Sequence, residues 1–196
     1  MNKQLGRLPV TGRVEVVPTA DRWESVYVAG RVPLARGWMT QVDNAENALF
    51  FDAELMTPAH YQAWLRRNAV QYVALSDAPP PTAGVTEKAL IEQGLPYLTR
   101  IWRNKVWTLY AVQNATSTVK GAVLLSQDGK GVTFRAGGPG EVVVRVRWSR
   151  WLTLEGPDAC LRPRGPWTRV QVHQPGDYQL SSALLPGGEP SECRPL

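Results

Sequence analysis

The feature that most constrains the fold is the alternation of apolar and polar residues in Glu141–Leu154, EVVVRVRWSRWLTL. Val142, Val144, Val146 and Trp148 recur at a spacing of two, and the residues between them, which include two arginines, point the other way. Because side chains alternate across a strand, this pattern is typical of a strand with one face in a core and one in water. The sequence therefore predicts one long central strand over the whole stretch.

Short strands with turn residues between them surround this stretch. The dipeptide Asp128-Gly129 lies between two apolar runs and predicts a hairpin. Further strands are expected at Trp167–Val172 and Tyr178–Leu184, and no helical period recurs in this half. Strands at such spacing indicate an antiparallel β-sandwich over residues 118–196.

The first half alternates strands with helices. Thr57 and Pro58 provide the N-cap and first residue of one helix, and Thr86 is expected to cap a second helix through Gln93. Strands are expected at Arg13–Val17, Val70–Leu75, Tyr97–Arg103 and Val106–Val112, the last two forming a hairpin. The fold class predicted for residues 11–117 is a small α/β domain, a sheet with two helices and a C-terminal hairpin.

The chain shows no recognisable catalytic motif. It lacks a nucleophile elbow, a phosphate loop and a dinucleotide fingerprint, and its two histidines, His60 and His173, have no partner at metal-ligand spacing. We therefore expect no catalytic residue, no metal and no cofactor in this chain. No run approaches the roughly 20 apolar residues of a membrane-spanning helix.

Arginine and tryptophan interleave in three places, RIWRNKVW, RVRWSRW and RPRGPWTR, and the formal net charge is +5. An exposed strand face with core tryptophans explains this pattern most simply. The alternatives are an anionic membrane surface, a sugar phosphate and a nucleic acid. Only two arginines, Arg145 and Arg147, point outward from the central strand, too few for a tight phosphate footprint, so no nucleic-acid partner is expected.

The two cysteines, Cys160 and Cys193, are compatible with two buried thiols in the cytosol or with one disulfide outside it. Both lie in loop-like contexts rich in proline and glycine, which favours the disulfide. Such a bridge would fasten the C-terminal tail to the β region and indicates an extracytoplasmic location.

The segment Arg36–Met56 has no regular period and is expected to be a long loop with an apolar patch at Leu49–Phe51. Long irregular loops in compact domains are usually functional or mobile. Its candidate binding residues are Arg36, Trp38, Asp43 and Phe50, because a guanidinium fits a phosphate and an aromatic ring stacks on a sugar. The alternative is an apolar lid with both aromatic rings buried.

Four stretches, RVEVVPTADRWE, VPLARGW, HYQAWLRRNAVQYVALSD and LPYLTRIWRNKVWTLYAV, together resemble the C-terminal part of polytopic membrane proteins of high-GC bacteria. These proteins are similar to C-type (GT-C) glycosyltransferases and are YfhO-related. The resemblance spans roughly residues 11–180. It implies a domain on the outer side of the membrane, after membrane helices that this chain lacks. The family's catalytic carboxylates lie between those helices, so none can be placed here.

These observations predict a non-catalytic, extracytoplasmic module of a glycosyltransferase-like membrane protein. Its expected partners are a glycan or lipid-linked sugar, and the membrane itself through a missing N-terminal transmembrane region. The parent protein would be the transferase. The alternatives are a free-standing carbohydrate-binding or adhesion module and, last, a basic nucleic-acid-binding domain.

Overall fold

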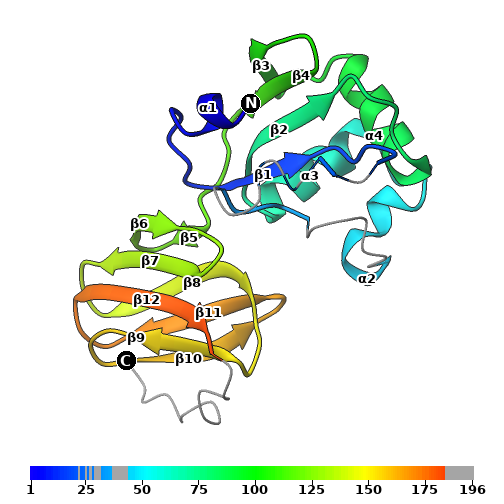
Figure 1. Ribbon diagram of the computed structural model, residues 1–196. Helices are drawn as coiled ribbons and strands as arrows, with labels where there is room; N and C mark the ends of the chain where they lie inside the picture. Colours follow the sequence, from blue (N-terminus) through cyan, green and yellow to red (C-terminus); the bar gives the residue numbers. More distant parts are fainter. Residues whose placement is uncertain (22, 25, 27, 29–31, 37–43, 184–196) are drawn as a thin grey trace. The chain divides into compact units, whose positions relative to one another are not determined.

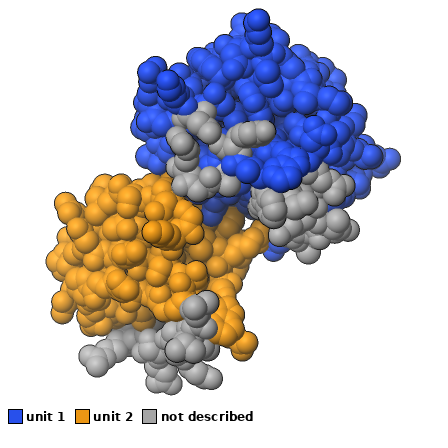
Figure 2. All heavy atoms as spheres, in the orientation of Figure 1, with its two compact units in different colours: residues 1–116 blue, residues 117–196 orange. Residues whose placement is uncertain are grey.

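A computed structural model of the chain describes residues 1–183 except 22, 25, 27, 29–31 and 37–43 (Figure 1). The chain divides into two compact units, Met1–Thr116 and Ser117–Leu196 (Figure 2). The described residues hold twelve strands in three four-stranded sheets and few helices. This β-rich architecture agrees with the predicted fold class in its coarse form.

The first unit is built on one mixed sheet with the strand order β1-β2-β4-β3. Strands β1 and β2 are parallel, and β2–β4 and β4–β3 are antiparallel, so the predicted hairpin is confirmed. The strand bounds are β1 Arg13–Val16, β2 Val70–Ser76, β3 Leu98–Arg103 and β4 Trp107–Val112. Strand β2 lies between two neighbours and is almost wholly buried, as its apolar sequence predicts.

Both faces of this sheet are covered at β1 and β2. On one face, Val73 and Leu75 of β2 pack against helix α3 (Pro58–Arg67) and helix α4 (Thr82–Glu92). On the other face, Tyr72 and Ala74 belong to a separate buried cluster that includes Leu5 of helix α1 (Asn2–Leu5). Because neither face of β1 and β2 is left to water, polar residues of these two strands can also be buried.

Local signals set the bounds of the two long helices. Thr57 caps α3, since its hydroxyl oxygen accepts the backbone N–H of His60 at 3.2 Å, and Pro58 is the first helical residue, as predicted. Helix α4 begins at Thr82, four residues before the expected cap at Thr86, because Pro81 already provides an extended residue at the N-cap. Gly94 follows with φ +90°, a conformation that favours glycine.

The prediction of an irregular loop over Arg36–Met56 is wrong for its described C-terminal part. Residues Asn44–Asn47 form the short helix α2, and Ala48–Phe50 form the 3₁₀ helix η1. Phe50 is buried against Tyr61 and Trp64 of α3, with ring centroids 6.5 and 4.8 Å away. Burial of the Phe50 ring holds η1 in place. The segment is too short to show a helical period in the sequence, so the sequence does not predict it.

The second unit consists of two antiparallel sheets, β10-β11-β8-β5 and β6-β7-β12-β9. Their inward side chains form one apolar cluster, in which Val142, Val144 and Val170 of one sheet meet Phe134 and Tyr178 of the other. The strand bounds are β5 Val119–Lys120, β6 Val123–Gln127, β7 Gly131–Ala136, β8 Gly140–Arg147, β9 Leu152–Glu155, β10 Ala159–Arg164, β11 Trp167–Val172 and β12 Gly176–Ser182.

The prediction of one continuous strand over Glu141–Leu154 is wrong in its second half. Strand β8 ends at Arg147, and β9 starts at Leu152 in the other sheet. A turn separates them: the backbone N–H of Leu152 donates to the carbonyl of Ser149 at 3.1 Å. The turn interrupts the alternation at residues 149–151. Because both sheets share one core, the apolar residues on either side of it, Val146 and Leu152, still fall at even-numbered positions.

Cys160 lies in strand β10 and is 8% exposed, so its expected position in a loop is wrong. The neighbouring prolines, which read as loop residues, are tolerated because β10 is the edge strand of its sheet. Its predicted partner, Cys193, is outside the described residues. The disulfide therefore stays a prediction.

Candidate functional site

The structure brings together two of the four predicted binding residues. The guanidinium carbon of Arg36 lies 3.7 Å from the centroid of the Phe50 ring, a cation–π contact. Trp38 and Asp43 are outside the described residues. The site is therefore described from Arg36 and Phe50 and from the residues around them.

Arg36 belongs to a buried polar cluster that sequence reasoning did not find. Its Nε donates to Oε1 of Glu15 at 2.8 Å, and one Nη donates to the same oxygen and to Glu87 Oε2, the latter at 2.7 Å. The hydroxyl of Tyr61 donates to Glu87 Oε1 at 2.8 Å. Both carboxyl groups are 0% exposed and the Arg36 side chain is 15% exposed.

The electrostatics of this cluster are unusual because two carboxyl groups share one guanidinium. Burial raises the pKa of Glu15 to about 8. The Arg36 guanidinium opposes this rise and the Glu87 carboxyl group adds to it. Burial, together with Glu87, also raises the pKa of Tyr61. The second carboxyl oxygen of Glu15, Oε2, is buried and has no hydrogen-bond partner among the residues that the structure describes. Protonation of Glu15 near neutral pH removes the excess negative charge from the interior.

The cluster ties together elements that are far apart in sequence. Glu15 lies on β1, Tyr61 on α3 and Glu87 on α4. Arg36 links Glu15 to Glu87 and covers Phe50 of η1, and Tyr61 joins the cluster through Glu87. Removing one partner from a buried ion pair leaves an uncompensated charge, which typically costs about 3–5 kcal/mol. The cluster therefore fixes how η1 packs on α3.

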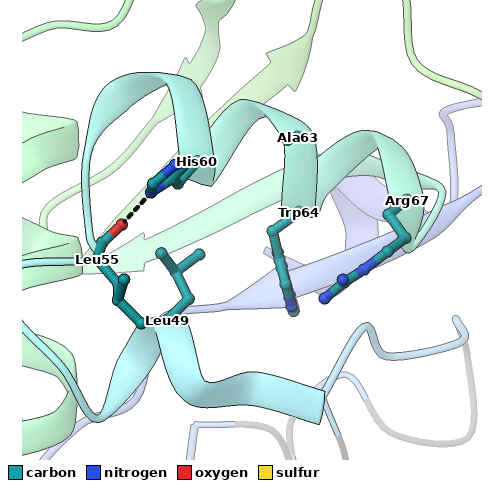
Figure 3. A pocket seen from close by; sticks show the side chains of 6 residues that line it. All are labelled: Leu49, Leu55, His60, Ala63, Trp64 and Arg67. Carbon is teal, nitrogen blue, oxygen red and sulfur yellow. Dashed lines mark hydrogen bonds between the residues drawn. The ribbon is translucent and has the colours of Figure 1, made fainter. Parts of the chain in front are cut away.

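An apolar pocket of about 280 Å³ lies between η1 and α3 (Figure 3). Leu49 comes from η1 and Leu55 from the turn after it, and the other walls are side chains of α3. The full lining, which we call the η1–α3 pocket, is Leu49, Leu55, His60, Ala63, Trp64 and Arg67. Its size is near the lower limit of about 300 Å³ for ligand pockets, so it suits one small group.

Three side chains give the pocket its polar character. His60 Nδ1 lies 2.9 Å from the Leu55 carbonyl oxygen (Figure 3), and since that oxygen can only accept, Nδ1 carries the proton. In the neutral ring Nε2 is then an acceptor. The indole N–H of Trp64 donates to Asn47 Oδ1 at 3.1 Å. Arg67 donates through one Nη to the carbonyl of Glu46 at 3.3 Å. Among the described residues this is the one hydrogen bond of its guanidinium, so its other N–H donors can serve a ligand.

The pocket and the buried cluster share one wall. Trp64 is 3% exposed, stacks with Tyr61 at 6.3 Å between ring centroids, and meets the Phe50 ring edge-on. The guanidinium of Arg36 lies over the Phe50 ring. The charged cluster therefore positions the aromatic wall of the pocket without lining it.

A signal for this pocket was present in the sequence. His60, Trp64 and Arg67 are spaced at i, i+4 and i+7, which places them on one helix face. The same sequence also places Trp64 with Tyr61 and Leu65 at i, i+3 and i+4, an apolar stripe that favours packing on the sheet and hides this signal. Leu49 and Leu55 could not be found this way, because their place opposite α3 depends on the packing of η1.

Within the described part of the chain, no group of three or more His, Cys, Asp and Glu side chains is placed to hold a metal ion. None of the helices described there combines the length and hydrophobicity that a bilayer-spanning segment requires. A second hollow, of about 380 Å³, is lined by Pro58, Ala59, Gln62, Pro96, Tyr97 and Gln113.

In comparisons with known proteins, no family model, no curated protein and no solved structure matches this chain. The chemistry of the η1–α3 pocket is therefore the basis for assigning a function.

Proposed function

We propose that this chain is a non-catalytic, extracytoplasmic module of a glycosyltransferase-like membrane protein, and that its η1–α3 pocket contacts a glycan or lipid-linked sugar. In this proposal residues 11–117 form a small α/β domain and residues 118–196 form a β-sandwich. The parent protein reaches the membrane through a transmembrane region that precedes this part.

The observation that supports the proposal is the combination of apolar walls with two nitrogen-bearing side chains in one pocket. Leucine and tryptophan side chains suit the C–H face of a sugar ring. The planar guanidinium of Arg67 suits the phosphate of a lipid-linked sugar, and His60 Nε2 can accept a sugar hydroxyl. The volume of about 280 Å³ limits the contact to a small part of the ligand.

In this proposal Arg36 and Phe50 act as positioning residues. The Arg36 guanidinium donates to two buried carboxyl groups and lies on Phe50, which in turn contacts the pocket wall at Trp64. Direct contact of Trp38 and Asp43 with the sugar stays a prediction.

Saturation-transfer NMR on the purified chain tests the proposal with methyl hexosides, hexose 1-phosphates and a hexose linked to a short prenyl phosphate. Ala63 lines the pocket and is exposed, so Ala63→Trp should fill the pocket without removing a buried contact. We expect saturation transfer to at least one of these ligands, and its loss in Ala63→Trp.

A matched control comes from the same helix. Ala59 is also exposed but lines the second hollow, so Ala59→Trp should leave binding unchanged. If the unsubstituted chain gives no transfer to any of the three ligand types, or if Ala63→Trp binds as well as Ala59→Trp, the pocket does not carry this function.

A further inference from the structure

The two sheets of the second unit differ in the charge of their strands. Sheet β10-β11-β8-β5 holds six basic side chains and one acidic side chain, Glu141. Sheet β6-β7-β12-β9 holds one basic side chain, Arg135, and two acidic ones, Glu155 and Asp177. The six basic residues are Lys120, Arg145, Arg147, Arg162, Arg164 and Arg169.

These basic residues share the outer face of their sheet, which we call the basic face. They alternate along the strands with inward residues such as Val144 and Val170, which belong to the core. The register places Arg162 directly opposite Arg169, a like-charge pair that destabilises a sheet. Glu141 forms ion pairs with Arg164 and Arg169, and the face remains strongly positive.

One end of the basic face also carries tryptophan. The register aligns Arg164 with Trp167, and Trp167 with Arg147. The Arg147 guanidinium carbon lies 5.6 Å from the Trp167 ring centroid. These side chains therefore form the last cross-strand row of the sheet at this end.

The loop from β8 to β9 adds a second arginine–tryptophan pair at the same end. The backbone N–H of Trp148 donates to the carbonyl of Pro166 at 3.3 Å, which holds the loop beside the turn between β10 and β11. Arg150 lies over the Trp151 ring at 4.9 Å, and Trp151 is 38% exposed. We call Arg147, Arg150, Trp151, Arg164 and Trp167 the Arg–Trp end.

We infer that the Arg–Trp end and the basic face dock on an anionic phospholipid surface. Guanidinium groups form charge-assisted hydrogen bonds with phosphate. Tryptophan prefers the headgroup level, where its apolar ring and its N–H are both accommodated. A soluble polyanion would use the charges but would not require an exposed indole. This inference concerns the second unit and does not depend on the sugar pocket of the first.

Co-sedimentation with vesicles tests the inference. The full chain is compared on phosphatidylcholine alone and on phosphatidylcholine with about a third of phosphatidylglycerol, at low and at physiological salt. A basic residue near an anionic leaflet contributes about 1 kcal/mol, so each lost charge should weaken binding by roughly fivefold. We expect binding to the mixed vesicles only, reduced by salt, and weakened about fivefold in Arg150→Gln and in Arg164→Gln.

Lys130→Gln is the matched control, because Lys130 is exposed in the turn between β6 and β7 of the other sheet. It should bind like the unsubstituted chain, and Trp151→Ser should bind more weakly. Equal binding to neutral vesicles, or equal weakening by Lys130→Gln and Arg150→Gln, would overturn the inference. If heparin binds as tightly as the vesicles and Trp151→Ser weakens neither interaction, the basic face binds a soluble polyanion instead.

Discussion

Replacing Arg36 by methionine should strongly destabilise the first unit. The substitution keeps most of the aliphatic packing but leaves the carboxyl groups of Glu15 and Glu87, both 0% exposed, without their shared guanidinium. Breaking a buried ion pair from one side costs about 3–5 kcal/mol, and loss of the cation–π contact with Phe50 adds up to about 2 kcal/mol. We therefore expect the free energy of unfolding of this unit to fall by at least about 3 kcal/mol.

Hydrogen exchange followed by mass spectrometry measures this effect within one unit. A chain of two units need not unfold in one step, so a global melt would mix them. Exchange of β2 amides reports the first unit, and exchange of β11 amides serves as the internal reference. A loss of 3–5 kcal/mol corresponds to exchange from β2 that is faster by roughly two to three and a half powers of ten.

Two controls make this prediction decisive. Arg66→Met, at an exposed position of α3, should change stability by no more than about 0.5 kcal/mol. The triple variant Arg36→Met, Glu15→Gln, Glu87→Gln should recover part of the loss, because a buried charge cluster can be replaced by neutral groups at little cost. A loss below about 1 kcal/mol in Arg36→Met would refute the view that this cluster holds the unit together.

Three further outcomes are expected. The folded-state pKa of Glu15 is raised from 4.5 to about 8, so its stabilisation is fully present below pH 4.5 and is lost as pH rises through 8. Exchange of β2 amides relative to β11 amides should show the first unit losing up to about 1.4 kcal/mol per pH unit in that window, and Glu15→Gln should flatten the profile. Thr57→Ala removes the N-cap of α3 and should cost about 1 kcal/mol in the same exchange experiment, whereas Thr57→Asp should not. Arg67→Gln should abolish any preference for hexose 1-phosphates over methyl hexosides in titration calorimetry, and an unchanged preference would remove Arg67 from the site.

Elements with strong local signals could be predicted from sequence. Helix α3 is set by Thr57 and Pro58, and strand β2 by an apolar run that suits only a strand covered on both faces. Each signal depends on residues within one turn or one strand, so no knowledge of the rest of the chain was needed.

The buried cluster could not be predicted, because it depends on long-range packing. In RVEVV, Glu15 reads as the water-facing residue of an amphipathic strand, but the helices of the first unit cover that face. Arg36 lies 21 residues after Glu15, and Glu87 lies 51 residues after Arg36. Nothing in the sequence near any of the three indicates the others.

The break between β8 and β9 was missed for a different reason. Alternation reports only which side chains face a core, and both sheets of the second unit face the same core. Residues on either side of the turn at Ser149 therefore keep one period although they belong to different sheets.

The most direct test of the proposed function is a two-dimensional ¹⁵N–¹H NMR titration of the 21.7 kDa chain with the prenyl-phosphate-linked hexose. If the account is correct, the amides that shift lie in η1 and α3, next to Leu49, His60 and Arg67, and the shifts disappear in Ala63→Trp but persist in Ala59→Trp. Shifts confined to the second unit, or shifts around the pocket that survive Ala63→Trp, would contradict it.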